Sequence, residues 1–154
     1  MKNIDLLLKQ LLKEEIVLLE KAQGHLVYSL TRVQMIDLTK DLDNHNLEIL
    51  DSFATRFLRL CEVLINQIVR TCLQLLGEYQ KTTIDNLNKA ESLDMITSAD
   101  DMNYIRMLRN KVAHEYVEDE WIEIYKDIIA YSTYLLTSTE MIKQIIDDRK
   151  WVIE

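Results

Sequence analysis

The chain has 154 residues, of which 26 are acidic and 18 are basic, so its formal net charge is −8. This length suits one domain with a single hydrophobic core, and we expect residues 1–154 to form it. The sequence contains no proline and only two glycines, which argues against folds built from strands and tight turns and favours an all-helical fold.

The negative charge also restricts the partners. Sequence-independent affinity for nucleic acid comes largely from lysines and arginines that replace phosphate counterions. We therefore expect no general binding of DNA or RNA, and any activity on nucleic acid has to come from a local cationic site.

No apolar run approaches the ~18 residues of a membrane span, and the Met-Lys-Asn-Ile start lacks the apolar region of a signal peptide. Cys61 and Cys72 fall inside an apolar helical pattern, so we expect core thiols in a reducing cytoplasm.

The first predicted element is an amphipathic helix. Its apolar residues recur at steps of three and four, which is typical of one helical face. They are Ile4, Leu7, Leu8, Leu11, Leu12, Ile16 and Leu19. Gly24 either ends this helix or kinks it, and residues 25–41 are ambiguous, with a second helix as one interpretation. The polar segment 41–46 is predicted to be a loop.

The next predicted helix covers about Leu47 to Leu76 and is apolar on two sides. The first stripe is Leu50, Phe53, Phe57, Cys61, Leu64, Ile68, Cys72 and Leu75. The second stripe is Leu58, Ile65, Val69, Leu73 and Leu76. A helix with two apolar sides is either central in its bundle or in contact with a partner subunit. Because a monomer of five helices would leave part of the second stripe exposed, we expect a homodimer built on this helix and on the helix that carries residues 109–116. Gly77 is a predicted C-cap.

The rest of the chain, from residue 82 onward, is predicted to form three further helices. A short helix is expected from Thr82 or Thr83 to Met95, and Ser98 to Asp101 resembles a capping box that starts another helix. An acidic turn at 118–120 is expected to precede a last helix. The apolar seam of that helix is Trp121, Ile124, Ile128, Tyr131, Leu135, Ile142 and Ile145. The predicted fold is an all-α, up-and-down bundle of about five helices.

The segment 109–116 carries most of the chemistry. A histidine has an ordinary pKa of about 6.5 and exchanges protons near neutral pH, and an arginine binds phosphate oxygens two at a time. Arg109 and His114 are therefore candidates for acid–base catalysis and charge stabilisation on a phosphodiester. Asn110 shares a helical face with His114, and Lys111 adds a cation. The alternative is structural, with a cation at a helix C-terminus and a surface imidazole.

Other kinds of site have weaker support. His114 and Glu118 are four residues apart, but two ligands do not make a metal site, and His25 and His45 are expected to be surface residues. The sequence also has no Gly-rich phosphate loop. We therefore expect neither a metal nor a cofactor.

Residues 109–116 resemble the signature of HEPN domains of the HepT-like branch. That signature is an arginine, four residues, a histidine, one residue and a tyrosine, here Arg109-Asn110-(Lys-Val-Ala)-His114-Glu115-Tyr116. The segment from Phe53 to Glu62 is similar to a further helix of the family, which has an acidic residue at its middle. The resemblance covers about residues 50–125.

The resemblance implies a homodimeric ribonuclease toxin that cleaves RNA without a metal ion. Arg109 and His114 would be the catalytic residues. Asn110 would have an orienting role in the same site, and Glu62 and Lys111 would be supporting residues of that site. In a two-fold dimer, two copies of the motif would face each other across one cleft.

The resemblance also implies a partner protein. HepT-like toxins are encoded beside a minimal nucleotidyltransferase, the antitoxin, which silences the toxin by adding AMP to the motif tyrosine, here Tyr116. Related helical proteins are instead non-catalytic, substrate-binding subunits of such nucleotidyltransferases. Both alternatives, toxin and non-catalytic partner subunit, remain open from the sequence.

Overall fold

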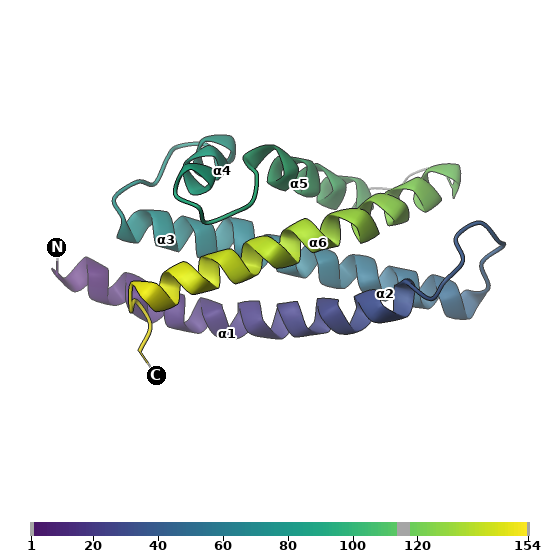
Figure 1. Ribbon diagram of the computed structural model, residues 1–154, viewed down its shortest axis with the longest axis horizontal. Helices are drawn as coiled ribbons and strands as arrows, with labels where there is room; N and C mark the ends of the chain where they lie inside the picture. The colour runs from purple at the N-terminus through teal and green to yellow at the C-terminus, as the bar shows by residue number, and fades with distance from the viewer. Residues whose placement is uncertain (1, 114–117, 154) are drawn as a thin grey trace.

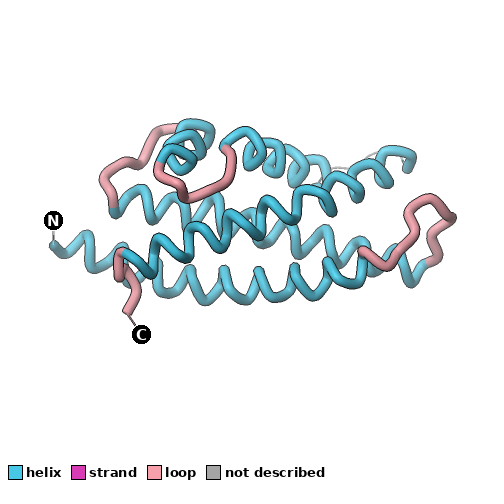
Figure 2. The backbone as a smooth tube through the Cα atoms, viewed as in Figure 1, coloured by secondary structure: helices cyan, strands magenta, loops and turns pink. Residues whose placement is uncertain are grey.

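The computed structural model describes residues 2–113 and 118–153, and these form helices and connections, without a strand (Figure 2). The elements are α1 (Lys2–Val33), α2 (Asn44–Cys61), the π-helix η1 (Glu62–Val69), α3 (Arg70–Leu75), α4 (Thr83–Ser92), α5 (Ala99–Ala113) and α6 (Glu118–Asp148). Because α2, η1 and α3 follow one another directly, we call residues 44–75 the second long helix. The described residues thus form five helical segments, and the predicted all-helical bundle is confirmed.

The bundle has an up-and-down arrangement (Figure 1). α1 runs along the long axis, the second long helix returns antiparallel to it, and α5 and α6 then repeat this reversal. The short α4 lies beside α5 on the same side of the second long helix. Both termini therefore lie toward the same end of the molecule.

The core lies between the long helices and α5. Residues from every helical segment contribute side chains that are almost fully removed from water, which is the main driving force for folding. The core includes Leu12, Leu19 and Leu26 of α1, Phe53, Phe57 and Leu64 of the second long helix, Leu87 of α4, Ile105 and Leu108 of α5, and Ile128, Leu135 and Ile142 of α6. Cys61 and Cys72 are buried free thiols, as predicted.

α1 differs from its prediction in two ways. It continues through Gly24 to Val33 without a break, so residues 25–33 belong to the first helix; a single glycine costs a helix only about 1 kcal/mol. The buried face is also narrower than the predicted stripe, because Ile4, Leu7 and Leu11 are exposed. An apolar row along α1 is thus left uncovered by the chain itself.

The ends of the second long helix are fixed by local hydrogen bonds. The Asp43 carboxylate accepts a hydrogen bond from the Asn46 amide at 2.8 Å and caps the start. At the other end Gly77 has φ of +69°, and the Glu78 amide donates to the Leu73 carbonyl at 2.8 Å. This pattern is a Schellman motif, and the predicted C-cap at Gly77 is confirmed.

α4 and α5 begin with side-chain caps. Thr82 accepts a hydrogen bond from the Asp85 amide at 3.1 Å, and Ser98 accepts one from the Asp101 amide at 3.2 Å. α4 ends at Ser92 rather than at the predicted Met95, because Asp94 adopts a left-handed conformation with φ of 58°.

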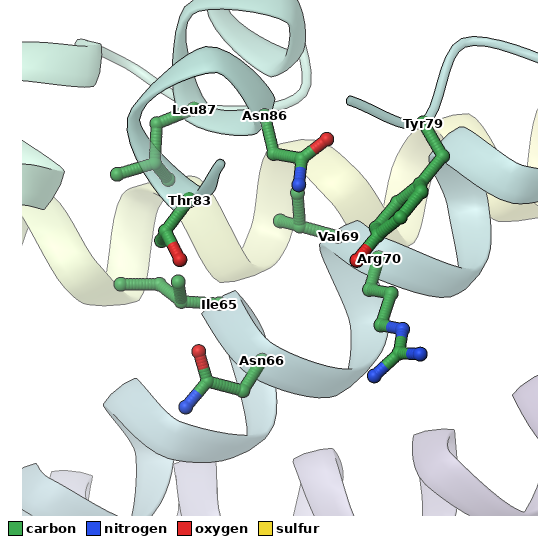
Figure 3. A pocket seen from close by; sticks show the side chains of 8 residues that line it. All are labelled: Ile65, Asn66, Val69, Arg70, Tyr79, Thr83, Asn86 and Leu87. Atoms are coloured by element: carbon green, nitrogen blue, oxygen red, sulfur yellow. The ribbon is translucent and has the colours of Figure 1, made fainter. Parts of the chain in front are cut away.

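The second apolar stripe is largely covered within the chain, and its end residues Leu58 and Leu76 stay partly exposed. Ile65, Val69 and Leu73 are buried, and Leu87 of α4 lies over the first two (Figure 3). The second long helix is therefore central in its bundle. The exposed apolar row on α1 is a further surface that the described residues leave uncovered.

α6 begins at Glu118, so the acidic segment 118–120 is the first turn of a helix and not the connecting turn that was predicted. The Tyr104 hydroxyl on α5 donates a hydrogen bond to the Asp127 carboxylate on α6 at 2.8 Å. That bond and burial raise the pKa of Tyr104 to about 12, so its hydroxyl stays neutral and ties the two helices together. None of the described helices is both long and apolar enough to span a membrane.

Candidate functional site

Arg109 lies in the last two turns of α5. The inner face of that helix buries Ala99, Met102, Ile105 and Leu108. These contacts fix the rotation of α5 and bring Arg109 to the edge of the second long helix.

The Arg109 guanidinium forms an ion pair with Glu62. Its Nη2 lies 2.9 Å from Glu62 Oε2, and the other carboxylate oxygen, Oε1, accepts a hydrogen bond from Asn66 at 2.8 Å. Oε1 of Glu62 is thus fixed by a hydrogen bond, and Oε2, which accepts none from the described residues, faces the arginine through the ion pair alone. The side chains of Arg109 and Glu62 are 36% and 41% exposed, so the pair contributes little to stability and its main effect is to position the guanidinium.

Glu62 is also the first residue of the π-helix η1. A π-helix closes its hydrogen bonds to the fifth residue, which is rare and occurs often at functional sites. The periodicity of the sequence did not predict it.

Arg109 also lines a groove between α1 and the second long helix. The groove has a volume of about 670 Å³. Its apolar part comes from Leu18, Ala22, Leu58 and Val63, and its polar part comes from Lys21, His25, Thr55, Arg59, Glu62, Gln67 and Arg109. Three of these side chains, Lys21, Arg59 and Arg109, are cationic and one, Glu62, is anionic, so the groove lining carries a net positive charge although the whole chain is anionic.

Two of these cationic residues, Lys21 and Arg59, were not predicted from the sequence to belong to a site, and His25 was predicted to be only a surface residue. His25 is exposed, and it lines the groove together with Arg109. The spacing of Lys21 and His25, four residues apart on one face of α1, was a usable signal, but the pairing of α1 with the second long helix was needed to interpret it.

The Cys61 thiol lies next to this ion pair. Burial raises its pKa to about 12, while the nearby Arg109 and Arg106 lower it and Glu62 raises it. Because a thiolate is needed for nucleophilic chemistry, Cys61 stays protonated and is a core residue, not a reactive group.

The other motif residues have different positions. Asn110 and Lys111 follow Arg109 on α5 and are exposed. His114 and Tyr116 lie outside the described residues, so the predicted shared face of Asn110 and His114 stays a prediction. Among the described residues, no group of three or more His, Cys, Asp or Glu side chains is arranged to hold a metal ion.

Compared with models of protein families, with curated proteins and with solved structures, the chain matches none.

Proposed function

We propose that this protein is a HepT-like toxin, an endoribonuclease that cleaves RNA with Arg109 and His114. The observation that carries the proposal is the position of Arg109. The arginine of the motif lies at a cationic groove in an all-helical bundle, and Glu62 and Asn66 hold it in place. A guanidinium fixed in this way suits recognition of a phosphate group.

The proposed reaction uses the chain's own groups. His114 takes the proton from a ribose 2′-hydroxyl, and the 2′-oxygen attacks the neighbouring phosphorus. The bond from phosphorus to the 5′-oxygen breaks, and a protonated histidine gives a proton to that oxygen. The products are a 2′,3′-cyclic phosphate and a 5′-hydroxyl. Arg109 stabilises the extra negative charge of the five-coordinate phosphorus.

The active form is proposed to be a homodimer, with the partner copy seated on the exposed side of α1. Ile4, Leu7 and Leu11 are exposed, and they share one helical face with Leu18, which lines the groove. A continuous apolar row of this kind is a favourable contact surface. A two-fold axis near it brings the two grooves together and supplies the second histidine.

Silencing is proposed to occur at Tyr116, through addition of AMP by a minimal nucleotidyltransferase encoded nearby. Lys111 and Asn110 are exposed beside Arg109 on α5, so a second enzyme has access to this side of the helix. A phosphodiester on Tyr116 would compete with RNA for Arg109, by charge and by bulk.

One observation favours a second candidate function, that of a non-catalytic subunit of a nucleotidyltransferase. The charge of Arg109 is already compensated by Glu62, and the whole chain is acidic, which weakens its attraction for RNA. In this case the chain would present Tyr116 to its partner without cleaving RNA itself.

Induction in cells separates the two functions. The experiment compares growth and total RNA integrity after induction of the wild-type chain and of His114→Ala. The ribonuclease predicts growth arrest and RNA fragments with the wild type only. Normal growth and intact RNA with both chains, at equal protein levels, would favour the non-catalytic subunit.

A further inference from the structure

A second, smaller pocket lies on the other side of the Glu62–Asn66 pair. It has a volume of about 170 Å³ and lies between the second long helix and α4 (Figure 3). Ile65, Val69 and Leu87 give it an apolar base. Tyr79 and Arg70 stand at one end and Asn66 and Thr83 at the other.

Tyr79 presents its ring at the surface on a fixed loop. The side chain of Asn86 accepts a hydrogen bond from the Gln80 amide at 2.7 Å and donates one to the Gln80 carbonyl at 3.2 Å. This double contact ties the loop to α4, and the turn at Gly77 ties it to α3. The backbone on both sides of Tyr79 is therefore fixed, and Tyr79 itself is 44% exposed.

Arg70 adds a cation to this aromatic surface. Its guanidinium carbon lies 5.6 Å from the centroid of the Tyr79 ring, within the range of a cation–π contact. The pair presents a flat aromatic face together with a charge that attracts phosphate. Proteins use this combination of groups to bind the bases and backbone of single-stranded nucleic acid.

Asn66 connects the pocket with Arg109. It lines the pocket, and its amide donates to Glu62 Oε1 while Glu62 Oε2 pairs with Arg109. Glu62 and Asn66 are about one helical turn apart. The aromatic pocket and the proposed catalytic arginine thus lie on one connected surface.

We propose that this pocket is a base-binding subsite for single-stranded RNA, in which a nucleobase stacks on Tyr79 and its edge meets the polar groups of Asn66 and Thr83. The subsite belongs to the ribonuclease proposed above and rests on that proposal. The volume is well below the roughly 300–1,000 Å³ of pockets for whole drug-sized ligands, so the pocket accepts one ring system and leaves the sugar and phosphate outside, near Arg70.

The experiment measures binding separately from cleavage. The probe is a fluorescent octauridylate with 2′-O-methyl groups at every position, which cannot form the cyclic phosphate, and affinity is determined by anisotropy at fixed salt. The proteins are the wild type, Tyr79→Ala, Tyr79→Phe and the control Tyr134→Ala. Tyr134 lies on α6 and is 45% exposed, against 44% for Tyr79, so the control removes an equally exposed ring elsewhere.

Loss of one stacked base weakens affinity by roughly 5- to 100-fold. We expect that loss for Tyr79→Ala, and affinities close to wild type for Tyr79→Phe and Tyr134→Ala. An octamer without bases should bind equally weakly to the wild type and to Tyr79→Ala. Equal affinity of the wild type and Tyr79→Ala for octauridylate, with unchanged circular dichroism, overturns the subsite.

The two proposals fail in different ways. If natural RNA is not cleaved but octauridylate binding still depends on Tyr79, the base-binding subsite is supported and the proposed catalysis is contradicted. If RNA cleavage depends on His114 but Tyr79→Ala binds octauridylate as tightly as the wild type, the proposed ribonuclease is supported and the subsite is contradicted.

Discussion

Glu62 and Arg109 meet across two helices, with 2.9 Å between carboxylate and guanidinium, at the residue where the second long helix changes from an α-helix to a π-helix. Asn66 holds the other oxygen of the carboxylate. An exposed pair of this kind adds little to stability. The main effect of the ion pair is to orient the Arg109 guanidinium at the cationic groove. The proposed activity depends on this orientation.

Replacing Glu62 should therefore change activity more than stability. Glu62→Gln removes the charge that orients Arg109, and we expect RNA cleavage to fall on the order of ten- to a hundredfold, as for a catalytic group displaced by about 1 Å. The free energy of unfolding should change by no more than about 1 kcal/mol. Cleavage rate and urea denaturation measure the two effects.

The control for this substitution is Glu123→Gln. Glu123 pairs with Lys126 on α6 at 3.3 Å and is also exposed, so it tests the loss of a surface ion pair alone. A rate equal to wild type in Glu62→Gln, or an equal loss in Glu123→Gln, would contradict the positioning role of Glu62.

The local features of the fold were predictable from the sequence. Gly77, Thr82 and Ser98 act at the helix ends where short-range rules locate them, and the series from Leu12 to Leu19 reports the buried face of α1. Gly24 misled the prediction because one glycine weakens a helix without ending it, and α1 buries residues on both sides of Gly24, such as Leu19 and Leu26.

Contacts between helices were less predictable. Burial of Ile65 and Val69 depends on α4 folding back over the second long helix. The presence of His25 and Arg109 in one groove depends on how α1 and α5 flank that helix. Neither follows from periodicity, which gives the face of a helix but not its neighbour. Glu62 was predicted to support Arg109 only through the family resemblance, and its contact with Arg109 is geometric information that the sequence does not contain.

The exposed row on α1 is the interface of the proposed homodimer. Sedimentation velocity at tens of micromolar should give a dimer for the wild type and a monomer for Leu11→Glu, because a charge in the row has to be desolvated on association. Val27→Glu is the matched control, since Val27 and Leu11 are 44% and 43% exposed and lie on opposite sides of α1. A monomeric wild type, or a dimer that survives Leu11→Glu, would contradict this interface.

Glu15 makes stability depend on pH. It is buried on α1, and its Oε1 accepts a hydrogen bond from Thr71 at 2.7 Å. Burial raises the pKa of Glu15 above its ordinary value of 4.5, against the opposing effects of Thr71 and Arg70. The folded state thus binds this proton more tightly than the unfolded chain. Protonated Glu15 therefore stabilises the folded state. This stabilisation is complete below about pH 4.5 and is lost as the pH rises through the pKa that Glu15 has in the folded protein.

Glu15→Gln does not ionise, so its stability relative to wild type should rise between pH 4.5 and pH 7.5. Urea denaturation at both values measures the change. Glu14→Gln, at the exposed neighbouring position, should show a smaller change. A difference between Glu15→Gln and wild type that is the same at the two pH values would exclude this effect of burial.

Tyr116 is predicted to be the site of silencing. Intact-mass spectra of the chain co-expressed with the neighbouring nucleotidyltransferase should show one or more added AMP units, and Tyr116→Phe should lack them and stay toxic. The substitution removes only the hydroxyl that forms the phosphodiester. An adduct mapped to Tyr104, or no adduct in the wild type, would contradict the assignment.

The most direct measurement is cleavage of a single-stranded RNA by the purified chain in the presence of EDTA. The proposed ribonuclease should produce fragments that end in 2′,3′-cyclic phosphate, with the rate reduced on the order of 10²-fold or more in both Arg109→Ala and His114→Ala. Cleavage that stops with EDTA, or that continues at the wild-type rate in His114→Ala, would contradict it.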